Sequence, residues 1–73
     1  MSRVLRRWVT THGDTVELFA GGQLSRRRHR FRYRVRARNG RVVETGSEGY
    51  VELHAAFEAA TRHHPIVEEV PVA

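Results

Sequence analysis

The strongest structural signal in the chain comes from residues 30–38, which read Arg-Phe-Arg-Tyr-Arg-Val-Arg-Ala-Arg. An arginine alternates with an apolar or aromatic residue at each step, which is the periodicity of a β-strand whose successive side chains point to opposite faces. The segment therefore predicts a strand with one cationic and one apolar face. Same-face neighbours about 6.6–7 Å apart are close to the phosphate spacing of a nucleic-acid strand. The cationic face would carry Arg30, Arg32, Arg34, Arg36 and Arg38, and the apolar face Phe31, Tyr33, Val35 and Ala37.

The residues that follow predict a β-hairpin. Asn39-Gly40 lies between two apolar-patterned runs and favours a type I′ turn, because both central residues of that turn need a positive φ. Residues 41–45 would then form the returning strand, with Val43 opposite Arg36 on the arginine face. An apolar residue on that face conflicts with a wholly polar surface, so a bulge or a longer loop is the alternative.

Residues 51–63 predict a helix that packs on the sheet. Their apolar side chains recur at helical spacing and form one stripe, and Pro65 stops the helix. The stripe needs an apolar surface to cover, so we expect Phe31, Tyr33 and Val35 beneath it. The stripe consists of Leu53, Ala56, Phe57 and Ala60.

The remaining segments complete one domain over residues 1–73. Residues 15–19 alternate like a strand, residues 3–10 predict an extra N-terminal strand, and residues 66–73 predict a short C-terminal strand or a tail. We therefore expect an α+β fold, a three- to four-stranded antiparallel sheet with one helix packed on one face.

Length and cysteine content bear on assembly and location. A domain of 73 residues buries little apolar surface, and without cysteine no disulfide can stabilise it. We therefore expect a homodimer, with the sheet edges or the Trp8 segment in the interface. No apolar run follows the basic N-terminus and none is long enough to span a membrane, so we expect a cytoplasmic protein with no membrane partner.

Charge is distributed unevenly along the chain. Residues 1–41 hold 12 arginines against Asp14 and Glu17, whereas residues 42–73 hold Arg62 against six glutamates. Such asymmetry indicates a basic surface for a polyanion. The alternative is that the two halves pair with each other, within one chain or across a dimer, with the strand arginines bound to Glu17, Glu44, Glu48 or a partner chain's glutamates. All 13 basic residues are arginine, which suits bidentate contacts to phosphate or carboxylate but is equally explained by GC-rich codon usage.

The aromatic residues between the arginines raise a nucleic-acid hypothesis. Phe31 and Tyr33 could stack on bases while arginines hold phosphates, although the strict alternation favours a place for them in the core. Trp8 is likewise expected in a core or an interface before a stacking role. We expect a small binding module that contacts DNA or RNA with little sequence specificity. The alternative is a protein–protein interaction or regulatory module whose arginine face pairs with an acidic protein surface. The expected nucleic-acid-binding residues are Arg26, Arg27, Arg28, Arg30, Arg32, Arg34 and Arg36.

Motifs for catalysis and metal binding are not found in the sequence. The histidines have neither the Cys₂His₂ nor the His-Glu-x-x-His spacing that binds zinc. Gly21-Gly22 is typical of a turn rather than a phosphate-binding loop, and Ser25 and Ser47 have no nucleophile–base pattern. We therefore expect no catalytic residue, no metal, no cofactor and no enzymatic activity. The histidines are His12, His29, His54, His63 and His64.

Residues 39–50, Asn-Gly-Arg-Val-Val-Glu-Thr-Gly-Ser-Glu-Gly-Tyr, resemble the signature of the YegP-like family of small proteins of unknown function. The most specific part is Ser-Glu-Gly-Tyr at residues 47–50. Residues 16–19 and 31–35 resemble the two preceding strands of that family's repeat, so the resemblance covers roughly residues 15–64. It implies an antiparallel sheet with a helix on one face, and no established enzymatic activity. Because many members carry tandem repeats, it also implies a dimer for a single-repeat chain.

The chain departs from the family pattern in its helix and in one turn. Leu53-His54 stands where the family usually has a lysine, and Thr61-Arg62-His63 replaces a Gly-Ile-like pair. The turn before the arginine-rich strand is extended by the Arg26-Arg27-Arg28 segment. The fold is expected to survive these changes, whereas any function tied to the helix lysine does not transfer.

Overall fold

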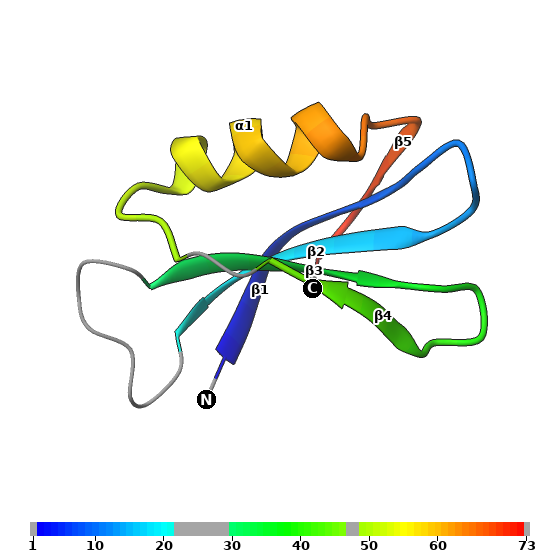
Figure 1. Ribbon diagram of the computed structural model, residues 1–73, viewed down its shortest axis with the longest axis horizontal. Helices are drawn as coiled ribbons and strands as arrows, with labels where there is room; N and C mark the ends of the chain where they lie inside the picture. Colours follow the sequence, from blue (N-terminus) through cyan, green and yellow to red (C-terminus); the bar gives the residue numbers. More distant parts are fainter. Residues whose placement is uncertain (1, 22–29, 47–48, 73) are drawn as a thin grey trace.

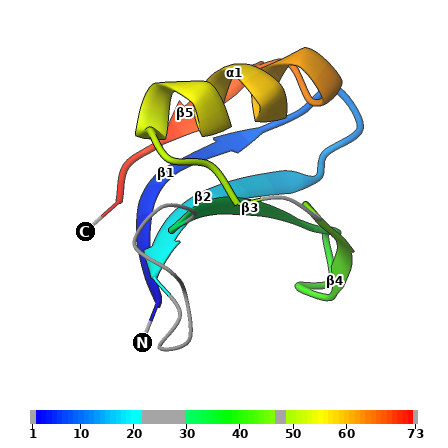
Figure 2. The ribbon, with the colours of Figure 1, turned by 60° about the vertical axis from the view of Figure 1, so that its left-hand side comes forward.

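The computed structural model describes residues 2–21, 30–46 and 49–72, which form one sheet and one helix (Figure 1). The strands are antiparallel and lie in the order β4-β3-β2-β1-β5. The helix lies across one face of the sheet (Figures 1 and 2), so the predicted α+β class with a helix on one face is confirmed. In chain order the elements are β1 (Ser2–Val9), β2 (Thr15–Gly21), β3 (Phe31–Arg36), β4 (Val42–Thr45), α1 (Leu53–His63) and β5 (Glu68–Val70).

The sheet has five strands rather than the three to four expected, because both terminal segments pair. β1 pairs with β2 from Ser2 opposite Gly21 to Val9 opposite Thr15. The other edge of β1 pairs with β5 over only three residues. Pro71, which has no backbone N–H, follows β5 and favours the end of pairing there. So short a strand carries little periodicity, which is why its sequence signal was weak.

The β3–β4 hairpin does not have the predicted type I′ turn, and it follows instead the stated alternative of a longer loop with a bulge. Gly40 N–H donates to the Ala37 carbonyl and Ala37 N–H donates to the Arg41 carbonyl, both at 2.9 Å, so the loop has three residues rather than two. Only Gly40 in this loop has a positive φ, of 86°, which is the pattern of a type I turn followed by a glycine bulge. The longer loop and a second bulge in the pairing place Val42 opposite Arg36, where Val43 was expected.

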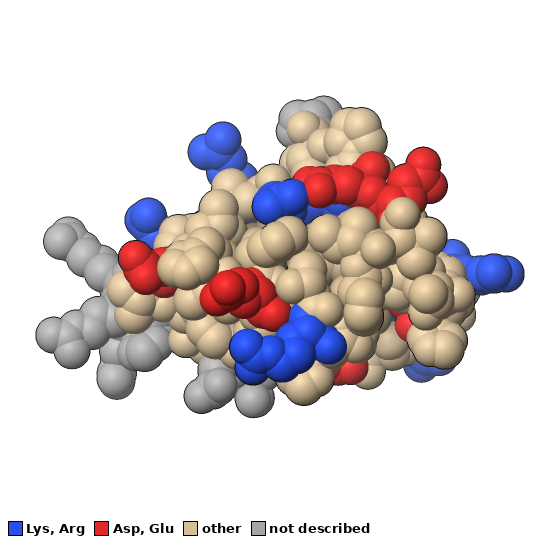
Figure 3. Space-filling model, turned by 90° about the horizontal axis from the view of Figure 1, so that it is seen from above, with Lys and Arg blue, Asp and Glu red and all other residues tan. Residues whose placement is uncertain are grey.

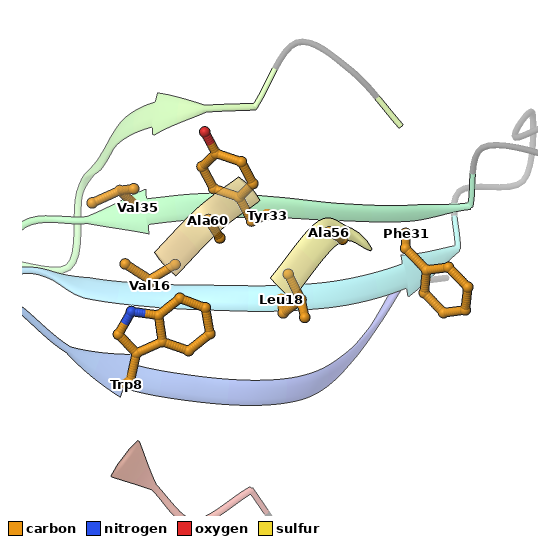
Figure 4. Close-up of a cluster of buried hydrophobic side chains, with 8 residues drawn as sticks. All are labelled: Trp8, Val16, Leu18, Phe31, Tyr33, Val35, Ala56 and Ala60. Atoms are coloured by element: carbon orange, nitrogen blue, oxygen red, sulfur yellow. The ribbon is translucent and has the colours of Figure 1, made fainter. Parts of the chain in front are cut away.

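The core lies between the helix and the sheet (Figure 4). As predicted, Phe31, Tyr33 and Val35 are buried on this face. The helix side chains that are fully buried are Ala56 and Ala60, and these small residues allow close packing on β2 and β3. The expectation that Phe57 is buried with them is only partly met. The remaining buried apolar side chains are Trp8 of β1 and Val16 and Leu18 of β2.

Trp8 and Phe57 lie together at one side of this core. Phe57 is half-buried, and its ring centre is 5.4 Å from that of Trp8, in an edge-on arrangement. Trp8 has no exposed surface, and its indole N–H donates to the His64 carbonyl at 2.8 Å, just beyond the helix. Trp8 therefore belongs to the core of one chain, and its side chain cannot supply the expected dimer interface. None of the described residues forms a helix that is long and apolar enough to cross a membrane.

Candidate functional site

The face of the sheet opposite the helix carries a set of arginines that we call the arginine face. Within the described residues, no helix or strand lies over it (Figure 1). In an antiparallel sheet, directly opposed residues share a face, so the register places the side chains in rows across the strands. We define the arginine face by Arg7 of β1, Glu17 and Phe19 of β2, and Arg32, Arg34 and Arg36 of β3.

Glu17 lies at the centre of the arginine face and binds three arginines. Its Oε1 accepts hydrogen bonds from Arg34 Nε at 2.7 Å and Arg36 Nε at 3.0 Å. Its Oε2 accepts from Arg7 Nε at 3.0 Å, and Arg7 Nη2 lies 2.9 Å away. The Glu17 side chain is 7% exposed, whereas the three arginine side chains are 24–35% exposed. One carboxylate therefore orders three cations and leaves the cluster with a net positive charge.

The cluster controls the ionisation of Glu17. Burial alone raises the pKa of its carboxyl group, but this is outweighed by hydrogen bonds from Arg34 and Arg36, the charge of Arg34 and the hydrogen bond from Arg7. The result is a pKa below the ordinary value of 4.5, so the carboxylate is ionised at neutral pH. Folding therefore favours the charged form of Glu17.

The lowered pKa of Glu17 predicts a loss of stability in acid. The folded state binds its proton less readily than the unfolded chain, so its contribution is present above pH 4.5 and is lost as the pH falls through the folded pKa. We expect the thermal unfolding temperature to decrease as the pH is lowered from about 5 to about 3. The Glu17→Gln variant should show a shallower dependence, measured by circular dichroism across that range. Equal slopes for both proteins would contradict a depressed Glu17 pKa. The comparison with this variant isolates Glu17, because the hydrogen bond from Arg6 also lowers the pKa of Glu69, which remains in both proteins.

Phe19 is the aromatic residue of the arginine face. It lies opposite Arg32 on one side and Val4 on the other, so the row contains one cation and two apolar side chains. The guanidinium carbon of Arg34 lies 4.8 Å from the centre of the Phe19 ring, within cation–π range. Arg34 therefore links the row that contains Glu17 to the row that contains Phe19, because its Nε binds Glu17 while its guanidinium contacts the Phe19 ring.

The structure brings three of the predicted site residues together. Arg32, Arg34 and Arg36 lie on the arginine face, whereas Arg30 is exposed just before β3, with its guanidinium 4.8 Å from the centre of the Phe31 ring. Phe31 and Tyr33, the suggested stacking residues, are instead core residues on the opposite face. Three of the predicted residues lie outside the described part of the chain, namely Arg26, Arg27 and Arg28.

Arg7 and Phe19 were not expected in this site, and Glu17 was expected there only in the alternative in which the strand arginines pair with glutamates. The alternation of β2 contained a signal for two of them, because Val16 and Leu18 point to the core and thus place Glu17 and Phe19 on the other face. Arg7 similarly alternates with the core residue Trp8. The sequence did not reveal the strand register, which places Phe19 opposite Arg32 and Glu17 opposite Arg34.

The helix side of the molecule has a different charge pattern. Figure 3 views this side and shows acidic and basic side chains next to one another. Arg6 makes a bidentate pair with Glu69, at 3.0 and 2.7 Å, and its guanidinium lies 4.0 Å from the centre of the Phe57 ring. These contacts match the alternative that basic and acidic halves of the chain pair, but they lie away from the arginine face.

A hollow of about 500 Å³ adjoins the N-terminal half of β1. Its lining combines aliphatic side chains with two arginines, one of which is Arg7 of the arginine face. The other arginine, Arg3, lies opposite Ala20 and therefore falls on the helix side of the sheet. The lining residues are Arg3, Val4, Leu5, Arg7 and Val72.

Histidine pairs with glutamate in two places without forming a metal centre. His64 Nε2 is 3.2 Å from Glu44 Oε2, and His54 Nε2 is 3.8 Å from Glu58 Oε1. Among residues 2–21, 30–46 and 49–72, no three histidine, aspartate or glutamate side chains gather closely enough to hold a metal ion. Structural metal sites take about four ligands, so neither pair makes such a site.

Comparison with protein-family models, with curated proteins and with solved structures finds no match to this chain. The resemblance to the YegP-like family therefore stays a prediction from the sequence motifs.

Proposed function

We propose that the protein is a small non-enzymatic binding module whose arginine face contacts nucleic acid with little sequence specificity. The observation that carries the proposal is the arrangement around Glu17, where one carboxylate orders three arginines on the sheet face that no described helix or strand covers. Backbone phosphates are the shared feature of all nucleic acids and carry no base information, which is why little sequence preference is expected.

The arginines keep donors for a phosphate after binding Glu17. Arg34 uses only its Nε for Glu17, and Arg36 uses Nε for Glu17 and Nη1 for the Gly40 carbonyl. Within the described residues, Arg32 forms no ion pair at all. A guanidinium has five N–H donors, so each of these side chains can still bind an anion while held in place.

An acidic protein surface is the competing partner, since carboxylates also bind arginine in a bidentate manner. Two features favour nucleic acid: the repeated arginine spacing along β3 and the aromatic ring at Phe19 in the same face. The two partners differ in salt dependence, because release of condensed counterions makes nucleic-acid affinity fall linearly with the logarithm of salt concentration.

Replacement of Arg32 provides the cleanest test of this proposal. Arg32→Gln leaves the Glu17 cluster intact, so the fold should be unchanged while one phosphate contact is lost. We expect weaker binding to every oligonucleotide alike, and a salt slope smaller by about 0.7 on single strands. The measurement is fluorescence anisotropy of labelled DNA and RNA at several salt concentrations.

Arg62→Gln is the matched control, because Arg62 is an exposed arginine in the last turn of α1, away from the arginine face. It removes the same charge and should leave the salt slope unchanged. Equal losses for both variants would mean that only net charge matters, and absence of binding by the unmodified protein at low salt would overturn the proposal.

A further inference from the structure

Phe19 is an unusual residue for a surface of arginines. The aromatic side chains of β1 and β3, Trp8, Phe31 and Tyr33, are buried in the core. Phe19 of β2 is only half-buried and lies opposite Val4 on the other face, over which no described helix or strand lies. Keeping an aromatic ring beside water costs free energy, and Phe19 stays half-buried with the Arg34 guanidinium 4.8 Å from its ring centre. The ring and Val4 thus form an apolar spot within a cationic surface.

This arrangement has the parts of a base-stacking site. Base–aromatic and base–guanidinium stacking are both sequence-tolerant, because every base presents a flat π-face. Arg34 is held at the ring by its hydrogen bond to Glu17, so its plane is ordered before any ligand arrives. Arg32, directly opposite Phe19, has no ion-pair partner among the described residues and can bind the adjoining phosphate.

We propose that the arginine face selects single-stranded over double-stranded nucleic acid, with an unpaired base stacked at Phe19 and Arg34. In a duplex, the bases are stacked on one another and present only their edges in the grooves, so a sheet face would meet phosphates alone. This inference rests on the proposed function. It adds that the same face prefers single-stranded to double-stranded nucleic acid.

The test compares three labelled ligands of equal phosphate number: a single-stranded oligonucleotide, a duplex, and an abasic strand that has the phosphates without the bases. Fluorescence anisotropy at low salt should show the base-containing single strand binding about tenfold more tightly than the abasic strand and the duplex. Because the unmodified protein is used, this comparison holds whether or not any variant folds.

Variants at Phe19 locate the stacking contact. Phe19→Leu keeps an apolar side chain and should weaken single-strand binding about tenfold while changing duplex binding little. Phe19→Tyr keeps the aromatic ring and should bind the single strand as tightly as the unmodified protein. Phe57→Leu, which alters the half-buried aromatic residue on the helix side, is the control and should bind like the unmodified protein. Circular dichroism reports the folding of each variant, because the fluorescence of Trp8 would respond to the loss of the Phe57 ring beside it.

The outcomes separate this inference from the proposed function. Tight binding to the single strand with loss in Phe19→Leu supports both. Equal affinity for single strand, abasic strand and duplex overturns the stacking site while the phosphate-binding function stands. No binding to any of the three ligands overturns both.

Discussion

The Trp8→Ala variant should be mostly unfolded at room temperature. Trp8 has no exposed surface, lies against Phe57 and donates its indole N–H to the His64 carbonyl. Truncating a buried tryptophan costs about 3–5 kcal/mol, and a core of this size supplies no more than about 3–5 kcal/mol in total. The loss should appear in the circular dichroism spectrum without denaturant, which should approach that of the urea-unfolded protein.

Trp8→Phe is the matched control for this prediction. It keeps an aromatic ring in the core but removes the donor to the His64 carbonyl, so it should cost less than the alanine variant. Unchanged stability in Trp8→Ala would show that β1 does not contribute to the core, and the five-stranded sheet would then be wrong.

The second large effect is expected from Glu17→Ala. This change leaves three partly buried arginines without their common acceptor, and it also removes the attraction that holds β1, β2 and β3 together on this face. Removing one partner of a fully buried pair costs roughly 3–5 kcal/mol. Because the arginines are partly exposed, we expect about 2–3 kcal/mol at neutral pH.

Glu69→Ala is the matched control for Glu17→Ala, because Glu69 also binds an arginine through two hydrogen bonds but does so at an exposed position. Surface pairs contribute little, so this variant should melt close to the unmodified protein. Similar losses of stability in the two variants would mean that the burial of Glu17 does not matter. The measurement is urea denaturation at neutral pH for all three proteins.

The arginine face was only partly predictable from the sequence. Alternation alone assigned Arg32, Arg34 and Arg36 to one side of a strand and Phe31, Tyr33 and Val35 to the core. It could not assign Glu17 to those arginines, because the contact depends on the register of β2 against both neighbours. Register is a property of strand pairs and turns, which a single segment does not encode.

Irregular positions account for the other differences. A bulge between Val4 and Arg6 breaks the alternation of β1, so Arg6 shares the helix side with Trp8 while Val4 lies on the arginine face. The hairpin after β3 was predicted correctly, but the predicted type I′ turn needs two residues with positive φ, and in this loop only Gly40 has one. Such bulges and turn choices follow from local packing that residue type does not specify.

The side-chain Nε–H signals of the arginines, followed by nuclear magnetic resonance as a single-stranded oligonucleotide is added, would show where nucleic acid binds. We predict that Arg7, Arg32, Arg34 and Arg36 shift together at low salt and return as salt is added, because a phosphate bound at one guanidinium changes the surroundings of its Nε–H and salt releases that phosphate. Arg6, which is held by Glu69 on the helix side, should not move. Shifts confined to Arg6 and Arg62, or no shifts at all, would contradict the arginine face as the binding surface.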